Sequence, residues 1–236
     1  MKKIAILQSN YIPWKGYFDI VNKVDLFIFH DDLQYTKNDW RNRNKIKTPN
    51  GLDWITIPCG TSEHRLICEV EIKDNKWQKQ HWARLEQSYK KAKFFNEYRE
   101  YFKEIYLGNE WKNLSDFNQV LIKRISKDIF DIKTTFEDSR KYNLTLKKAE
   151  RVLELIKKVE GTHYLSGPSA KNYLTEDLFT KENIELEWMD YSGYKEYEQL
   201  NPPFEHGVTI LDLIFNEGPN ARNFMKSFKQ EKGKNE

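Results

Sequence analysis

The apolar positions of the chain fall into short runs, separated by polar loops and by segments with helical periodicity. The runs at 4–7 (IAIL) and 26–30 (LFIFH) are too short for helices of their own and are typical of strands buried on both faces. Further apolar or alternating runs predict strands at 54–59, 66–72 and 132–138. The segments 162–167, 184–191 and 208–218 complete the pattern as a final α/β stretch.

Helical periodicity is strongest in the middle of the chain. Apolar residues share one helical face from Trp77 to Tyr89, and the stripe resumes at Phe94 after a break at 90–93. We expect Ser115 to cap a third helix of this region.

Two helices are predicted outside this region. One is a short helix at 17–24, directly after the first strand and its loop, and the other begins at Asn143 and ends at Gly161. Strands that alternate with helices predict an α/β fold with a Rossmann-like, mostly parallel sheet and a helical layer inserted around 75–128. We expect a single domain over 1–225 and a charged flexible tail over 226–236.

Composition narrows the classes of protein. The 236 residues include 39 Lys and Arg and 36 Asp and Glu, so the formal net charge is only +3 and a general nucleic-acid binder is not indicated. No run has the length of a secretory signal or a membrane span, which predicts a cytoplasmic protein without membrane insertion. Cys59 and Cys68 lie in predicted strands and are expected to be buried free thiols, and the five histidines lack metal-ligand spacing.

The polar chemistry is concentrated in loops that follow predicted strands. In open α/β sheets, ligands bind beyond the carboxyl ends of the strands, where such loops meet. The loop at 8–16, the segment at 31–45 and the segment at 167–173 satisfy this rule. Their candidate ligand-binding side chains are Gln8, Asn10, Lys15, Asp31, Asp32, Gln34, Lys37, Arg41, Arg43, Lys45, Ser169 and Asn172.

Two arginines give the segment at 31–45 a specific interpretation. Arg41 and Arg43 alternate in an extended stretch, so both would project from one face and, with Lys15 or Lys45, could hold a diphosphate. The carboxylates would then recognise hydroxyl or amine groups, a combination that suits a nucleotide-linked sugar. A structural interpretation stays open, in which Asp31 and Asp32 pair with nearby arginines and the basic run is a solvated hairpin arm.

Five blocks of sequence resemble a known family. "IAILQSNYIPWKGYFDIV", "DDLQYTKNDWRNRNKIKT", "WITIPC", "YLSGPSAKNYL" and "YEQLNPPFEHGVTILDLIFNEG" occur in this order and together resemble the WbqC-like family over residues 4 to about 218. Members of that family tend to be encoded with O-antigen and other surface-polysaccharide biosynthesis functions. The resemblance therefore implies a role in sugar-nucleotide or glycan modification, and it assigns no catalytic residue.

These observations favour a transferase that modifies a nucleotide-linked amino sugar by acyl or aminoacyl transfer. Asp32 or His206 would be the general base, and Asn10, Gln34 or main-chain N–H groups would stabilise the oxyanion. The cofactor is an acyl or aminoacyl donor of unassigned identity, no metal is required, and an oligomer is compatible with the sequence.

Three alternative functions stay open. A nucleotidyltransferase or ATP-dependent ligase would place Mg²⁺ on Asp31 and Asp32. A non-catalytic partner of a glycosyltransferase would use Trp77, Trp82 and Trp111 as its interface. Nucleic-acid binding through the aromatic and basic stretch at 35–47 comes last, because acidic residues balance its charge.

Overall fold

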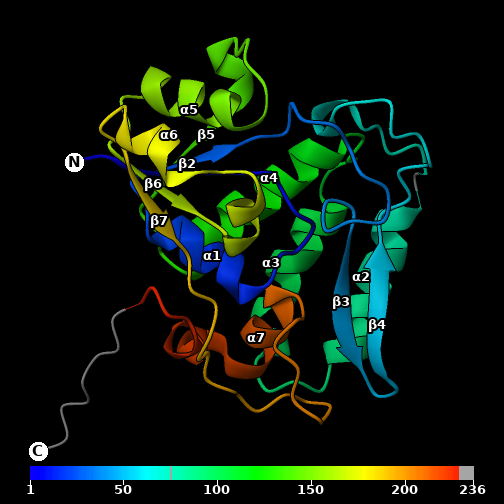
Figure 1. The fold of residues 1–236 in the computed structure, drawn as a ribbon. Helices are drawn as coiled ribbons and strands as arrows, with labels where there is room; N and C mark the ends of the chain where they lie inside the picture. Colours follow the sequence, from blue (N-terminus) through cyan, green and yellow to red (C-terminus); the bar gives the residue numbers. More distant parts are fainter. Residues whose placement is uncertain (75, 229–236) are drawn as a thin grey trace, which may run out of the picture.

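A parallel five-stranded sheet forms the centre of the computed structural model, which describes residues 1–74 and 76–228 (Figure 1). The spatial order of the strands is β5-β2-β1-β6-β7, and all four neighbouring pairs are parallel. From β1 the sheet is extended in one direction by β2 and β5 and in the opposite direction by β6 and β7, so it has the strand order of the Rossmann fold, with a topological switch point between β1 and β6. The predicted α/β class is confirmed. The strands are β1 (Lys3–Leu7), β2 (Leu26–Phe29), β5 (Thr135–Asp138), β6 (His163–Ser166) and β7 (Glu185–Trp188).

Helices cover both faces of this sheet. Ala5 and Phe27 point into one core with Phe18 of α1 (Lys15–Asn22). Ile28 points into a second core with Ile156 of α5 (Lys148–Lys158), where α6 (Glu176–Thr180) also packs. Burial on both faces explains why the central strands are continuous apolar runs without alternation. Figure 1 shows α5 and α6 on one side of the sheet and α1 on the other.

The predicted helical layer lies beside the sheet together with a β-hairpin that the sequence left undefined. The hairpin pairs Arg43 with Thr56 and Ile46 with Asp53 in antiparallel register. The elements of this part are β3 (Arg43–Thr48), β4 (Gly51–Thr56), α2 (Trp77–Tyr89), α3 (Phe95–Leu107), α4 (Leu114–Arg124), which continues as a π-helical turn (Ile125–Ile129), and α7 (Ile210–Glu217). Among the described helices, none is both long and apolar enough to cross a membrane.

Aromatic side chains hold the helical layer together from inside. Trp77 is 1% exposed and packs edge-on against Phe117, and Trp82 is 5% exposed and stacks on Phe95. Trp111 is half-buried against Phe117, and its indole N–H donates to the Ile105 carbonyl oxygen. Trp77 and Trp82 therefore belong to the core and do not form the expected docking interface, whereas the half-buried Trp111 packs against this core.

Local structure differs from the prediction between the hairpin and α2. The segment 66–72 contains a 3₁₀ turn (Ile67–Glu69) in place of a strand, with isolated bridges from Leu66 to Gln34 and from Glu71 to Asn113. Ile67 and Val70 are fully buried three positions apart, so the apparent alternation did not mark a strand face. Both thiols are free, but Cys59 follows β4 and the half-buried Cys68 lies in this turn.

Two predicted helix starts are also displaced. The cap of α4 is Asn113, whose Oδ1 accepts the Asp116 N–H at 3.1 Å, and Ser115 lies inside the helix. Asn143 adopts a left-handed backbone (φ +47°), which asparagine tolerates, after a 3₁₀ turn (Ser139–Tyr142), and α5 begins five residues later.

The end of the chain folds back onto the sheet part. After a 3₁₀ helix (Gly218–Phe224), the backbone N–H groups of Lys226 and Ser227 donate to the Asp19 carboxylate at 3.0 and 2.8 Å. The first residues of the predicted tail are thus anchored, and residues 229–236 lie outside the described residues.

Candidate functional site

The loop between β1 and α1 is fixed by hydrogen bonds to two distant segments. The Tyr11 N–H donates to the Trp40 carbonyl at 2.9 Å, and the Ile210 N–H donates to the Pro13 carbonyl at 2.9 Å. The buried Asn44 amide donates to the carbonyls of Tyr11 and Ile12 at 3.1 and 2.8 Å. These bonds join three segments that are far apart in the sequence.

The backbone of this loop is strained at one residue. Ile12 has φ +36°, a conformation that is costly for a β-branched residue. Such strain persists only where the surroundings hold it, and here Asn44 holds the Ile12 carbonyl directly.

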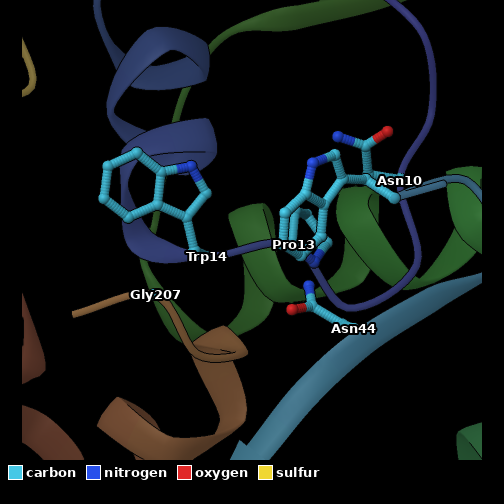
Figure 2. A pocket seen from close by; sticks show the side chains of 6 residues that line it. Asn10, Pro13, Trp14, Asn44 and Gly207 are labelled. Atoms are coloured by element: carbon cyan, nitrogen blue, oxygen red, sulfur yellow. The ribbon is translucent and has the colours of Figure 1, made fainter. Parts of the chain in front are cut away.

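The loop forms one wall of a pocket of about 290 Å³, which we call the loop pocket. In Figure 2 the Trp14 indole lies on one side of the view and the Asn10 carboxamide on the other, with Pro13 between them and Asn44 below. Asn10 makes no side-chain hydrogen bond within the described residues, so its amide is available to a ligand. The lining residues are Asn10, Pro13, Trp14, Trp40, Asn44 and Gly207.

Both indoles of the loop pocket are held from behind. Trp14 packs edge-on against Tyr191 and Tyr194, with ring centroids 5.0 and 5.6 Å away. Its ring also folds across Gly16, where an added Cβ would lie 2.7 Å from the Trp14 Cε2 atom. Trp40 is 43% exposed and packs on Trp54 with centroids 5.4 Å apart.

Lys15 and His206 lie near the loop pocket. Lys15 is 3% exposed, its Nζ donates to the Lys195 carbonyl at 3.1 Å, and the rings of Tyr194 and Tyr197 lie 4.9 and 5.2 Å from it. Burial lowers the pKa of Lys15 to about 8. Burial and the nearby Lys15 charge lower the pKa of His206, so its imidazole is neutral at pH 7. Its buried Nδ1 has no hydrogen-bond partner in the described part of the chain.

A second pocket, of about 250 Å³, lies where the topological switch point places a ligand site. We call it the switch-point pocket. Leu7 and Gln8 from the end of β1 contribute one wall, and Lys148 and Arg151 from the first turn of α5 contribute another. The remaining lining residues are Ile6, His30, Leu33, Val152, Tyr164 and Tyr173.

Arg151 is fixed by four hydrogen bonds. Its Nε donates to His30 Nε2 at 3.1 Å, Nη1 donates to the carbonyls of Leu144 and Leu146, and Nη2 is paired with Asp32. Four of the five guanidinium N–H groups are thus used, and one on Nη2 remains. Because His30 accepts from Arg151, its imidazole must be neutral; burial, followed by the Arg151 charge, lowers the pKa of His30 to about 4.

Lys148 provides the other cation of this pocket. It is exposed and has no ion-pair partner among the residues described. Its backbone adopts φ +52°, which is uncommon for a lysine. The first turn of α5 also places the positive end of the helix dipole near the pocket.

The two candidate carboxylates have different partners inside the protein. Asp31 is fully buried and accepts from the Ser9 N–H at 2.7 Å, the Gln119 amide at 3.1 Å and the Ser115 hydroxyl. Asp32 accepts from the Ser139 hydroxyl in addition to Arg151. Within residues 1–74 and 76–228, no three His, Cys, Asp or Glu side chains form a group that could hold a metal ion.

The remaining predicted residues lie outside both pockets. Arg41 lies in a turn before β3 and pairs with Asp39, whereas Arg43 stacks on Trp54 at 4.2 Å, so the two guanidinium groups do not share an extended stretch. Lys45 faces the same indole at 5.5 Å. Gln34 and Lys37 lie on an exposed turn bonded to Glu63. Ser169 and Asn172 are exposed in the 3₁₀ turn (Pro168–Asn172) next to Tyr173 of the switch-point pocket.

Sequence reasoning missed Trp40, Asn44, Lys148 and Arg151. Trp40 and Asn44 lie inside the segment at 31–45, but neither carries the charge on which the interpretation of that segment was based. The other two follow the sheet strand β5, and the rule that ligands bind beyond strand ends could have included the loop that leads into α5.

The strand order and the two pockets define the class: a Rossmann-type α/β protein with pockets at the carboxyl edge of its sheet. The chain belongs to the WbqC-like protein family, whose model matches residues 8–224. It is 45% identical to an uncharacterized protein of Mycobacterium tuberculosis (strain ATCC 25618 / H37Rv), Rv1507c, over 98% of this chain and 100% of the relative. No solved structure matches the chain.

Proposed function

We propose that the protein is a transferase that acylates or aminoacylates an amino sugar carried on a nucleotide, in surface-polysaccharide biosynthesis. The proposal is based on one observation: a pocket lined by two cations of α5 lies at the Rossmann switch point. Lys148, the free N–H of Arg151 and the Gln8 amide suit the phosphates of such a ligand. The positive end of α5 favours the same charge.

The structure supports a division of roles between the two predicted bases. Asp32 is bonded to Arg151 and Ser139, which suits a positioning residue for the guanidinium group. His206 is neutral at pH 7 and its side chain is only half-buried, which suits a proton acceptor.

The reaction forms one bond and breaks one bond. The sugar amine attacks the carbonyl carbon of an acyl or aminoacyl thioester, so that a C–N bond forms and the C–S bond breaks. The proton lost by the amine passes to His206 and then to the departing thiolate.

A binding experiment tests the proposal. Calorimetry would compare uridine and thymidine diphosphates, their amino-sugar conjugates, and ATP with and without Mg²⁺. We expect the diphosphate compounds to bind and Lys148→Ala to weaken them about tenfold, since a hydrogen bond to a charged group contributes ~1.5–3 kcal/mol. Lys157→Ala is the matched control, because Lys157 lies on the same helix but pairs with Glu182.

Turnover separates the enzyme classes. With an acyl thioester present, release of free thiol should depend on the amino-sugar conjugate and slow about 100-fold in His206→Asn. Binding of ATP with Mg²⁺ alone would favour the ligase alternative. The absence of binding by every nucleotide compound would contradict the proposal.

A further inference from the structure

We propose that the loop pocket is a subsite for the pyranose ring of the ligand, next to the switch-point pocket that holds its phosphates. This inference rests on the proposed function and extends it to a second site. It follows from the position of the loop pocket, its chemistry, its rigidity and its size.

The two pockets are neighbours along the same loop. Gln8 lines the switch-point pocket and Asn10 lines the loop pocket. Two residues of fully extended chain span at most about 7 Å, so the two lining positions are no farther apart than this. This bound on the backbone separation of Gln8 and Asn10 is compatible with one ligand whose phosphate and sugar groups are linked.

The chemistry of the loop pocket matches a sugar ring. A pyranose presents an apolar C–H face and a rim of polar hydroxyl groups. Trp14, Trp40 and Pro13 offer apolar surfaces, and the Asn10 amide offers both a donor and an acceptor that the described residues leave unused. A purely apolar acyl chain would leave that amide without a partner, which carries an energetic cost.

The loop pocket is also rigid before a ligand arrives. Tyr191 and Tyr194 hold the Trp14 indole, and Trp54 holds Trp40 from behind. Trp54 is itself covered by the Arg43 guanidinium at 4.2 Å, so this arginine supports the indole wall of the pocket. A preformed site avoids the entropy cost of ordering side chains on binding.

The size of the loop pocket indicates one ring. Its volume of about 290 Å³ lies near the lower limit of the ~300–1,000 Å³ found for small-molecule pockets. A whole sugar nucleotide would not fit, and a second site must hold the remainder, as the switch-point pocket does here.

The test compares two ligands in four proteins by calorimetry. The ligands are a nucleoside diphosphate, uridine or thymidine diphosphate, and its amino-sugar conjugate. The proteins are the wild type, Trp40→Ala, Asn10→Ala and Leu52→Ala. Leu52 is the matched control, because it is also 43% exposed and lies on the same hairpin as the Trp54 that supports Trp40. Thermal melts would confirm that each variant is folded.

The expected result is a gain in affinity from the sugar that depends on the loop pocket. We expect the wild type to bind the conjugate about tenfold more tightly than the parent diphosphate, and Trp40→Ala and Asn10→Ala each to lose most of this gain. The Kd of the parent diphosphate should change by less than about twofold in both variants.

Three outcomes would overturn the inference. A gain that survives both substitutions would place the sugar elsewhere, with the proposed function intact. An equal loss for the parent diphosphate would assign the loop pocket to the nucleobase, because bases also stack on indoles. The absence of nucleotide binding by the wild type would overturn both the proposed function and this inference.

Discussion

The loop pocket and the switch-point pocket share one loop but differ in chemistry. Two indoles give the loop pocket apolar walls, and Asn10 gives it one free amide. Lys148 and Arg151 give the switch-point pocket its cations. The difference suits a ligand with a sugar ring at one end and phosphates at the other.

The two pockets nevertheless have similar support. A residue with a positive φ that is neither Asn nor Asp lies at each one, Ile12 beside the loop pocket and Lys148 in the switch-point pocket. A buried neutral histidine also supports each one, His30 as a lining residue of the switch-point pocket and His81 through Tyr11 of the loop. His30 accepts from Arg151, and His81 accepts from the Tyr11 hydroxyl through Nδ1 at 2.8 Å, because its Nε2 donates to the Thr56 carbonyl. One scaffold therefore orients both kinds of chemistry.

The largest loss of stability is expected for a substitution of Asp31, which supports the loop that lines both pockets. Asp31 accepts from the Ser9 N–H, and Ser9 lies between Gln8 of one pocket and Asn10 of the other. Asp31→Ala would leave the buried Ser9 N–H and Ser115 hydroxyl without their acceptor, whereas the Gln119 amide would keep Asp138, and it should lower the free energy of unfolding by roughly 3–5 kcal/mol. Urea denaturation measures this as a lower midpoint with an unchanged slope.

A second aspartate provides the control for Asp31. The Asp53 side chain is 51% exposed and pairs with Arg84 on the surface, so Asp53→Ala should cost less than about 1 kcal/mol. Equal effects of the two substitutions would show that Asp31 is not a structural support of the loop.

The same aspartate shows what the sequence could and could not predict. The buried strands, the α/β class and the loop after β1 followed from apolar runs and from the strand-end rule. Side-chain partners did not follow, because Asp31 is bonded to Ser115 and Gln119, more than 80 residues away in the sequence.

Charge in the segment at 31–45 was misleading for a related reason. A sequence does not distinguish an arginine that is free to bind a ligand from one that pairs with another residue of the protein. Arg41 pairs with Asp39 and Arg43 stacks on Trp54, whereas the cations of the switch-point pocket come from α5. Only the tertiary fold brings Lys148 and Arg151 to the end of β1.

The second prediction uses the two buried histidines. Burial is the main cause that lowers the pKa of His30 and of His81 to about 4, against an ordinary value of 6.5. Between pH 6.5 and 4 the unfolded chain binds more protons than the folded protein, so the free energy of unfolding falls as the pH falls through this range. From pH 7 to pH 5 the loss should be about 2 kcal/mol for each histidine.

The measurement is urea denaturation at pH 7 and pH 5. His30→Gln and His81→Asn should each remove about half of the pH-dependent loss that the pair contributes. Because each variant is compared with itself at two pH values, its intrinsic change in stability cancels. An unchanged pH dependence in both variants would contradict the assignment of neutral buried imidazoles.

A substitution of Asn44 is expected to affect binding in the loop pocket and to leave binding in the switch-point pocket intact. Asn44→Ala removes the donor to the Tyr11 and Ile12 carbonyls and the acceptor of the Lys45 N–H. We expect a loss of roughly 2–3 kcal/mol, since buried backbone groups lose their partners, together with a loss of binding in the loop pocket. Binding of the parent diphosphate in the switch-point pocket should remain.

A neighbouring amide is the control for Asn44. Asn42 is similarly buried but donates to the Ile57 carbonyl at 3.0 Å, so it braces the hairpin segment and not the loop. Asn42→Ala should lower stability without removing the affinity gain from the sugar. Loss of that gain in Asn42→Ala as well would show that the hairpin as a whole, and not the brace at Ile12, shapes the pocket.

The smallest change in stability, with a selective loss of binding, is expected for Gly16→Ala. The new methyl group would meet the Trp14 ring, with Cε2 only 2.7 Å away, and the indole must turn out of the loop pocket. Turning the held indole breaks its contacts with Tyr191 and Tyr194. The helix propensity of alanine, which exceeds that of glycine by ~1 kcal/mol, offsets only part of this cost, so the free energy of unfolding should fall by about 1–2 kcal/mol. The affinity gain from the sugar should fall about tenfold, while the parent diphosphate binds as in the wild type.

Gly167→Ala is the control, because its methyl group would meet nothing closer than the Tyr191 hydroxyl at 3.8 Å. Calorimetry that finds the full sugar gain in Gly16→Ala would show that Trp14 does not contact the ring, and would leave Trp40 as the indole that does.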